Sequence, residues 1–118
     1  MATYHTEQSA TVNLDTAGDV SADITLAQSD RTVQVIPNVT SWGEGPALVE
    51  LRWASTNSSF VSFDPPVYLR SNEPSRVLDL ARAMRLQLYT VTAGGSGADA
   101  PGQFYLTFGV EYRVNEAA

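Results

Sequence analysis

The sequence predicts an all-β protein, an antiparallel β-sandwich of seven or eight short strands with an Ig-like or jelly-roll-like arrangement. Apolar and polar residues alternate along most of the 118-residue chain, and such alternation is typical of strands that bury one face. Clusters of Gly, Pro, Asn, Asp and Ser interrupt the alternation about every 10–15 residues, as turns between short strands do. A chain of this length normally forms one domain, and we expect it to occupy residues 8–114.

The first third of the chain predicts a terminal arm followed by three strands. Residues 1–7 and 115–118 lie outside the alternation, so we expect a flexible arm and a flexible tail there. Alternating residues on both sides of a turn at 15–19 predict a hairpin, with one buried face made of Ala10, Val12, Leu14, Val20, Ala22, Ile24 and Leu26. A third strand is expected over residues 32–36, where Pro37 ends it.

Three further strands are expected in the middle of the chain. Residues 47–55 predict a strand whose faces follow from alternation, with Val49, Leu51 and Trp53 on one and Leu48, Glu50 and Arg52 on the other. Residues 60–63 and 67–69 predict two short strands. We expect Asp64-Pro65-Pro66 to separate them, because proline lacks the N–H that a central ladder requires.

The stretch from Arg76 to Met84 fits two structures. Leu78 and Leu80 match the spacing of a strand, whereas Val77, Leu80, Ala81 and Met84 match the spacing of a helix. So short a pattern does not separate the two periods. We expect a strand over residues 76–80 followed by a turn or one short helical turn near 80–84, and a helix of about two turns is the alternative.

The last third predicts two long strands joined by a loop. Residues 85–92 form the first strand, and residues 104–114 alternate without interruption, with the aromatic residues Phe104 and Phe108 on the apolar face. The glycine-rich segment 93–102 lies between them. We expect a hairpin with a flexible ten-residue tip, and a terminal strand that is central to the core.

Composition removes several classes of chemistry. The chain has no cysteine, and its seven basic residues are all arginine, so it lacks disulfides, thiolate nucleophiles, Cys-based metal sites and lysine Schiff bases. A single histidine, His5, leaves little room for a Ser-His-Asp triad or a multi-histidine metal site. Asp15, Asp19 and Asp23 could suit calcium, but we interpret them as solvated hairpin residues. We therefore expect a protein that is not an enzyme and has no catalytic residue, metal or cofactor.

Nucleic acid, nucleotide and membrane partners are also disfavoured. The formal net charge of −6 opposes binding to phosphate backbones. The 93–102 loop follows a strand, as a phosphate loop does, but it leads into another strand and lacks the lysine. No apolar run approaches the ~18 residues of a membrane span. The N-terminus lacks the basic and apolar regions of a secretory signal.

Charge is distributed unevenly along the chain. Residues 1–30 contain five acidic residues and no arginine, whereas residues 70–85 contain four of the seven arginines, Arg70, Arg76, Arg82 and Arg85. Arginine suits interfaces because its planar group forms two parallel hydrogen bonds with a carboxylate. Two copies could therefore meet acid to arginine, or the arginine segment could dock on an acidic partner. The alternative is an ordinary solvated surface.

Three other residues are candidate partner contacts. Tyr4 lies in the N-terminal arm, where an extended segment could add a strand to a neighbouring sheet. Asp99 lies in the 93–102 loop, which could become ordered on a partner. Trp42 lies beside a turn, so it either contacts a partner or packs at the edge of the core. Trp53 shares a face with Val49 and is expected in the core.

The middle of the chain resembles small all-β structural proteins of tailed bacteriophage virions. The resemblance rests on the run from Asn38 to Ser55, in which the turn Trp42-Gly43-Glu44-Gly45-Pro46 precedes an alternating strand. Arg76-Val77-Leu78-Asp79-Leu80 and the stretch from Met84 to Gly94 are similar in the same way.

The resemblance implies a non-enzymatic virion protein that is made in the bacterial cytoplasm. Its partner would be the major capsid protein or another virion protein, and it would act as a capsid decoration (cement) protein that stabilises the head. A homo-oligomer, for example a trimer, is expected. Two alternatives stay open: a carbohydrate- or receptor-binding module of a tail fibre that uses Trp42 with Asn38 and Glu44, and a tail or connector subunit.

Overall fold

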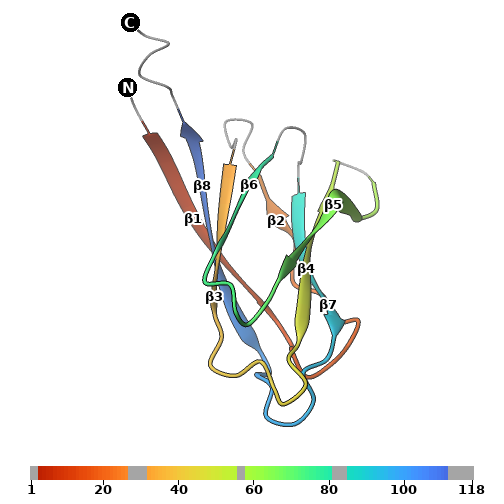
Figure 1. Ribbon diagram of the computed structural model, residues 1–118. Coiled ribbons are helices and arrows are strands. Elements are labelled where there is room, and N and C mark those ends of the chain that lie inside the picture. The colour runs from red at the N-terminus through yellow and green to blue at the C-terminus, as the bar shows by residue number, and fades with distance from the viewer. Residues whose placement is uncertain (1–2, 27–31, 56–57, 81–84, 112–118) are drawn as a thin grey trace, which may run out of the picture.

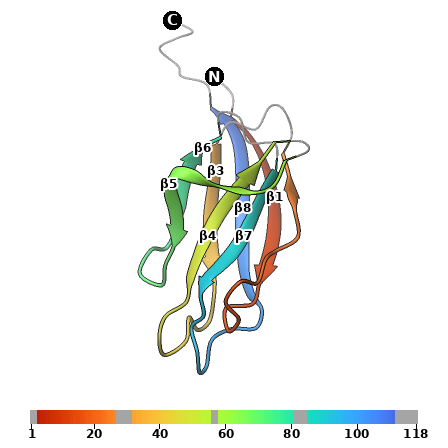
Figure 2. The same ribbon diagram turned by 90° about the vertical axis from the view of Figure 1, so that its right-hand side faces the viewer.

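The computed structural model describes residues 3–26, 32–55, 58–80 and 85–111. These residues form eight strands and no helix: β1 (Thr3–Val12), β2 (Ile24–Thr25), β3 (Thr32–Asn38), β4 (Leu48–Ala54), β5 (Val61–Leu69), β6 (Arg76–Asp79), β7 (Arg85–Thr92) and β8 (Gly102–Glu111). The strands pack as two layers (Figures 1 and 2). The predicted antiparallel β-sandwich is confirmed.

The two layers are four-stranded sheets with interleaved connections. One sheet has the order β1-β8-β3-β6 and the other has the order β2-β7-β4-β5, with antiparallel pairing throughout. Among the described strands, β4 and β5 are the only two that are adjacent both in the sequence and in a sheet. Every other connection therefore passes from one sheet to the other.

The core lies between the sheets and is built on β8. Phe104, Leu106 and Phe108 alternate along this strand and are 0% exposed. β8 lies between β1 and β3 in its sheet, which confirms that the last strand is central to the core. Leu86 and Leu88 of β7 supply buried side chains from the opposite sheet. Apolar burial of this kind is the dominant favourable term in folding.

Two expected hairpins are wrong. β1 and β2 lie in different sheets, and so do β7 and β8. Of the residues expected to line the first hairpin, Val20 is 47% exposed and forms only an isolated bridge with Tyr89. The physical reason is that the segment after the first turn bonds to β7 and not to β1, since Gly18 and Ser21 donate their N–H groups to the carbonyls of Thr90 and Leu88. β1 is instead paired with β8.

Prolines lie inside two strands that were expected to end at them. β3 continues through Pro37, where β6 no longer pairs with it, since β6 reaches only from Thr32 to Val35. β5 runs as one strand through Pro65 and Pro66 at the edge of its sheet. Its pairing with β4 passes from Leu51↔Val67 to Arg52↔Ser62, so both prolines lie where no ladder bond is required.

Several expected boundaries differ from the structure or lie outside its described part. β1 begins at Thr3 and pairs with β8 from that residue onward, so residues 3–7 belong to the sandwich and are not a separate arm. β6 matches the strand expected over residues 76–80. The helical turn near 80–84 and the 115–118 tail lie outside the described residues, apart from Leu80, which is in neither a helix nor a strand.

Three loops bond to one another at one end of the sandwich. Leu14 donates its N–H to the carbonyl of Asp99 over 2.9 Å, and Gly94 donates its N–H to the carbonyl of Leu14 over 2.8 Å. Gly45 in turn donates to the carbonyl of Gly94 over 3.0 Å. The 93–102 loop is therefore bonded to its neighbours at several points and is not a free hairpin tip.

Gly94 tests how closely these loops must pack. A Cβ at this position would overlap the carbonyl oxygen of Trp42, whereas a Cβ at Gly45 would approach only the carbonyl oxygen of Gly94, at 4.0 Å. We expect Gly94→Ala to lower the free energy of unfolding by about 1–3 kcal/mol, as overpacking does. Gly45→Ala, the matched control, should change it by less than about 0.5 kcal/mol. Urea titration measures both, and equal effects would contradict the packing account.

Candidate functional site

Two of the predicted contact residues serve the fold. Trp42 is half-buried and packs edge-on against Phe104, with ring centroids 6.1 Å apart. Asp99 Oδ2 accepts the N–H of Thr40 over 2.7 Å, and its backbone N–H bonds to Ser41. Trp42 therefore occupies the edge-of-core position, and Asp99 closes the loop end of the sandwich.

Arg85 connects the acidic segment to the arginine segment within one chain. Its Nη1 lies 2.8 Å from Asp23 Oδ2, and its Nη2 donates to the carbonyls of Ser55 and Ser58 over 3.1 and 2.7 Å. Its guanidinium also stacks on the ring of Phe60, with Cζ 4.9 Å from the ring centroid. At this position the acidic and arginine segments therefore meet within one chain, whereas the hypothesis was a contact between two copies or with an acidic partner.

The other predicted residues are dispersed. Arg76 on β6 lies 3.7 Å from Glu73, three residues earlier in the chain. Tyr4 lies on β1, where it is paired with Val110, and Arg82 lies outside the described residues. Arg70 is exposed at the end of β5 and, among the described residues, has no carboxylate partner.

The outer face of the second sheet gathers arginine and tyrosine from three strands. Val49 and Leu51 of β4 point into the core, so alternation turns Glu50 and Arg52 outward. The register places Glu50 between Tyr68 of β5 and Tyr89 of β7. β4, β5 and β7 lie in front in Figure 2. We call this set the arginine–tyrosine face: Glu50, Arg52, Tyr68, Arg70 and Tyr89.

Glu50 and Arg52 form the centre of this face. Arg52 Nε donates to Glu50 Oε1 over 2.8 Å, and the Glu50 side chain is only 4% exposed. The Arg52 guanidinium covers the ring of Tyr89, with Cζ 3.7 Å from the ring centroid. A carboxylate this deeply buried requires a charged partner. Arg52 neutralises Glu50 and leaves a flat, partly aromatic surface over the middle of the sheet.

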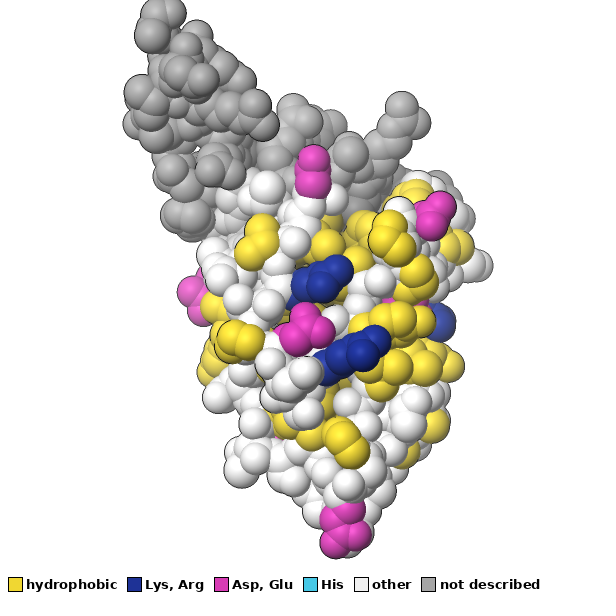
Figure 3. Space-filling model, in the orientation of Figure 1, with side chains coloured by type: hydrophobic (Ala, Val, Ile, Leu, Met, Phe, Trp, Pro, Cys, Tyr) yellow, Lys and Arg dark blue, Asp and Glu magenta, His cyan; other side chains and the backbone are white. Residues whose placement is uncertain are grey.

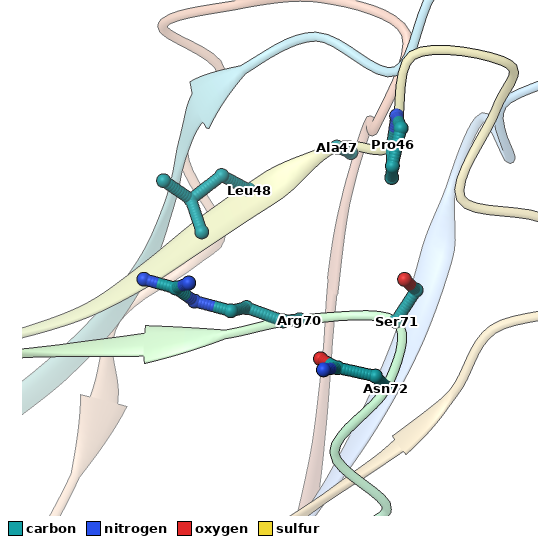
Figure 4. A pocket seen from close by; sticks show the side chains of 6 residues that line it. All are labelled: Pro46, Ala47, Leu48, Arg70, Ser71 and Asn72. Carbon is teal, nitrogen blue, oxygen red and sulfur yellow. The ribbon is translucent and has the colours of Figure 1, made fainter.

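Arg70 borders a hollow at the end of the arginine–tyrosine face. Its guanidinium lies 5.5 Å from the centroid of the Tyr68 ring. The adjoining hollow has a volume of about 410 Å³, and its lining residues are Pro46, Ala47, Leu48, Arg70, Ser71 and Asn72. In Figure 4 the Arg70 side chain extends beside Leu48, and Ser71 lies across the hollow from Pro46. One wall is apolar, and the other carries a cation, a hydroxyl and an amide.

The side of the sandwich where the chain passes from β5 to β6 also combines cationic and apolar side chains, over a wider area than the hollow. Arginine side chains lie near its middle with an acidic side chain between them, and hydrophobic side chains lie beside them (Figure 3). Arginine and tyrosine are enriched at the centres of protein interfaces. The chemistry available here is therefore stacking, apolar contact and hydrogen bonding to a carboxylate or carbonyl group.

In the part of the chain that the structure describes, no three His, Asp or Glu side chains lie close enough together to hold a metal ion. No helix among these residues is long and apolar enough to cross a membrane.

Four members of the arginine–tyrosine face were not predicted as contacts from the sequence. Alternation already assigned Glu50 and Arg52 to the face of their strand opposite Val49. The signal for Tyr68 and Tyr89 is also alternation, because each lies between two buried residues of its strand. What the sequence lacked was the strand order, which brings β5 and β7 to the two sides of β4.

Comparison with known proteins gives little information about this chain. No protein-family model matches it, and no curated protein matches it. A solved structure, the crystal structure of FLHE, matches with a TM-score of 0.48 and 10% sequence identity, over 94% of this chain and 97% of that chain. We draw nothing about function from a likeness of this size.

Removal of Arg52 tests whether it neutralises Glu50. Arg52→Met leaves the buried carboxylate without its partner, so the free energy of unfolding should fall by about 1–3 kcal/mol. Adding Glu50→Gln to Arg52→Met should recover part of this loss, because the remaining group is uncharged. Arg70→Met, the exposed control, should change stability by less than about 0.5 kcal/mol. Chemical denaturation at neutral pH measures these variants together with Glu50→Gln alone, and additive effects at positions 50 and 52 would refute the coupling.

Proposed function

We propose that this chain is a non-enzymatic structural protein that docks on another protein through its arginine–tyrosine face. The observation that carries the proposal is Arg70, an exposed cation with no carboxylate partner among the described residues, beside Tyr68 and a hollow with an apolar wall. An arginine in this setting is a typical anchor for an acidic side chain of a partner.

The structure of the face supports a rigid docking surface. Glu50, Arg52, Tyr68 and Tyr89 lie on three paired strands, and Arg70 directly follows the last residue of β5. Sites built on strands hold their geometry better than sites on loops. Arg52 is held by Glu50 and Tyr89, so little side-chain entropy remains to be lost on binding there. Arg70, in contrast, has its charge available for a partner.

For the partner we propose a virion shell, with this chain as a capsid decoration protein. This step rests on the resemblance of residues 38–55 and 76–94 to phage structural proteins. A protein that binds only the assembled shell stabilises it by mass action, and repetition over the lattice adds avidity. The proposed partner is the major capsid protein, and the proposed location is the virion.

Arg70→Ala tests the proposed surface. We expect it to weaken binding to phage heads assembled without this protein by at least about tenfold, which corresponds to about 1.4 kcal/mol. Arg76→Ala is the matched control, because Arg76 is another arginine of the same segment but pairs with Glu73. Co-sedimentation with the heads measures both affinities. Equal losses in the two variants would show that the arginine–tyrosine face is not the docking surface.

Salt dependence and glycan binding separate this proposal from its alternative. Raising the salt concentration to about 0.5 M should weaken binding, because it screens a partly exposed arginine–carboxylate contact. A tail-fibre receptor module would instead bind host polysaccharide and ignore the heads. Quenching of tryptophan fluorescence by such a polysaccharide, without binding to heads, would replace the decoration proposal with the receptor proposal.

A further inference from the structure

The four edge strands of the sandwich differ sharply in how well they are protected. β2 has two residues and β6 has four, and short edges offer few free main-chain groups. β5 is longer, but its pairing with β4 is interrupted and it contains Asp64-Pro65-Pro66. Prolines and irregular pairing are the usual means by which an edge avoids a further strand. Three edges are therefore blunted, which means that they are poorly suited to pairing with a further strand.

β1 is the exception. It pairs with β8 in an unbroken register over ten residues, from Thr3↔Glu111 to Val12↔Gly102. Its sequence contains no proline and no arginine, and Glu7 is its only acidic residue. Among the described strands, it is the one edge that is both long and regular.

No contact among the described residues covers the outer edge of β1. Gln8 reaches the carbonyl of Thr25 in the other sheet over 3.1 Å, but it does so with its side chain. Gln8 also lies on the face of β1 that carries the buried Ala10 and Val12, so the bond spans the two sheets. Within the described residues, the backbone hydrogen bonds outside the strand ladders involve no residue of β1.

We infer that β1 pairs antiparallel with β1 of a second copy of this chain, across a two-fold axis. A regular open strand binds another strand by main-chain hydrogen bonds. Pairing with a different edge of a second copy would need another long regular strand, and the other three edges are blunted. Only pairing of β1 with β1 gives each copy a long, regular partner strand. Such an isologous contact closes as a dimer.

The proposed dimer joins two four-stranded sheets into one continuous sheet. Full overlap of β1 with its copy would add on the order of ten main-chain hydrogen bonds, since antiparallel residues exchange them in pairs. The register must avoid setting Glu7 directly opposite its own copy, because like charges face to face oppose pairing. This surface is separate from the arginine–tyrosine face, so the inference does not depend on the proposed function.

The absence of cysteine from the natural chain permits a direct test by single-cysteine scanning. Each position of β1 is changed to cysteine in turn, and disulfide-linked dimers are measured under mild oxidation. In an antiparallel pair, residues equivalent by symmetry separate by about 7 Å for each step away from the axis, whereas a disulfide needs Cα atoms within about 7 Å. We expect crosslinking to peak at one position, or two neighbouring positions, and to fall steeply on both sides.

Val77→Cys is the matched control, because Val77 lies on the short edge strand β6 and is 64% exposed. It should crosslink weakly and without relation to the β1 profile. In parallel, light scattering of the unmodified chain should give about twice the 12.7 kDa of one copy. A monomeric mass at every concentration tested would overturn the inference, and so would a flat profile along β1.

Proline substitution supplies a second measurement. Thr6→Pro and Glu7→Pro remove two consecutive N–H groups, of which one faces β8 and the other faces the open edge. The variant that loses the edge N–H should keep its near-ultraviolet circular dichroism and become monomeric, whereas the other should lose stability. A folded proline variant that stays dimeric would place the contact elsewhere.

Discussion

Burial of the inward-facing side chains of β8 between the two sheets is the constraint on which the rest of the structure depends. Phe104, Leu106 and Phe108 carry the largest part of the apolar surface of this strand, and none is exposed. Because β8 pairs with both β1 and β3, its register decides which of their residues face inward: Ala10 pairs with Phe104, and Val35 pairs with Leu106. A slip of one residue would turn the phenylalanines toward solvent.

The position of β8 also explains where the polar chemistry lies. β8 and the strand before it, β7, lie in different sheets, so their connection crosses the end of the sandwich and bonds to the two other loops there. That end is occupied by structural contacts such as Trp42 on Phe104. Arg52 and Tyr89 lie on the outer face of the second sheet. β1 forms one edge of the first sheet. The proposed docking face and the proposed pairing edge therefore lie on different parts of one fold.

The alternation of apolar and polar residues predicted most of the strands. It gave errors where main-chain hydrogen bonds determine which strands pair. It located β4, β7 and β8, because most of their inward residues are apolar at every second position. It also located β6, although there Arg76 shares a face with Leu78. It placed Val20 in a buried face, but Val20 is exposed because its segment bonds to β7 and sets Val20 beside the outward-facing Tyr89. It ended strands at Pro37 and Pro65, yet both continue where no neighbour needs the missing N–H. These errors concern pairing, which single-strand periodicity does not report.

The sequence by itself determined the sandwich class, the central role of the last strand and the face of β4 on which Glu50 and Arg52 lie. These follow from side-chain periodicity, which is a local property of each strand. Only the tertiary structure decided that Arg85 binds Asp23 within the chain, that Tyr68 and Tyr89 flank Glu50, and that β1 is a long open edge. The physical reason is that hydrogen-bonded neighbours come from distant segments, and their order depends on how the loops cross between the sheets.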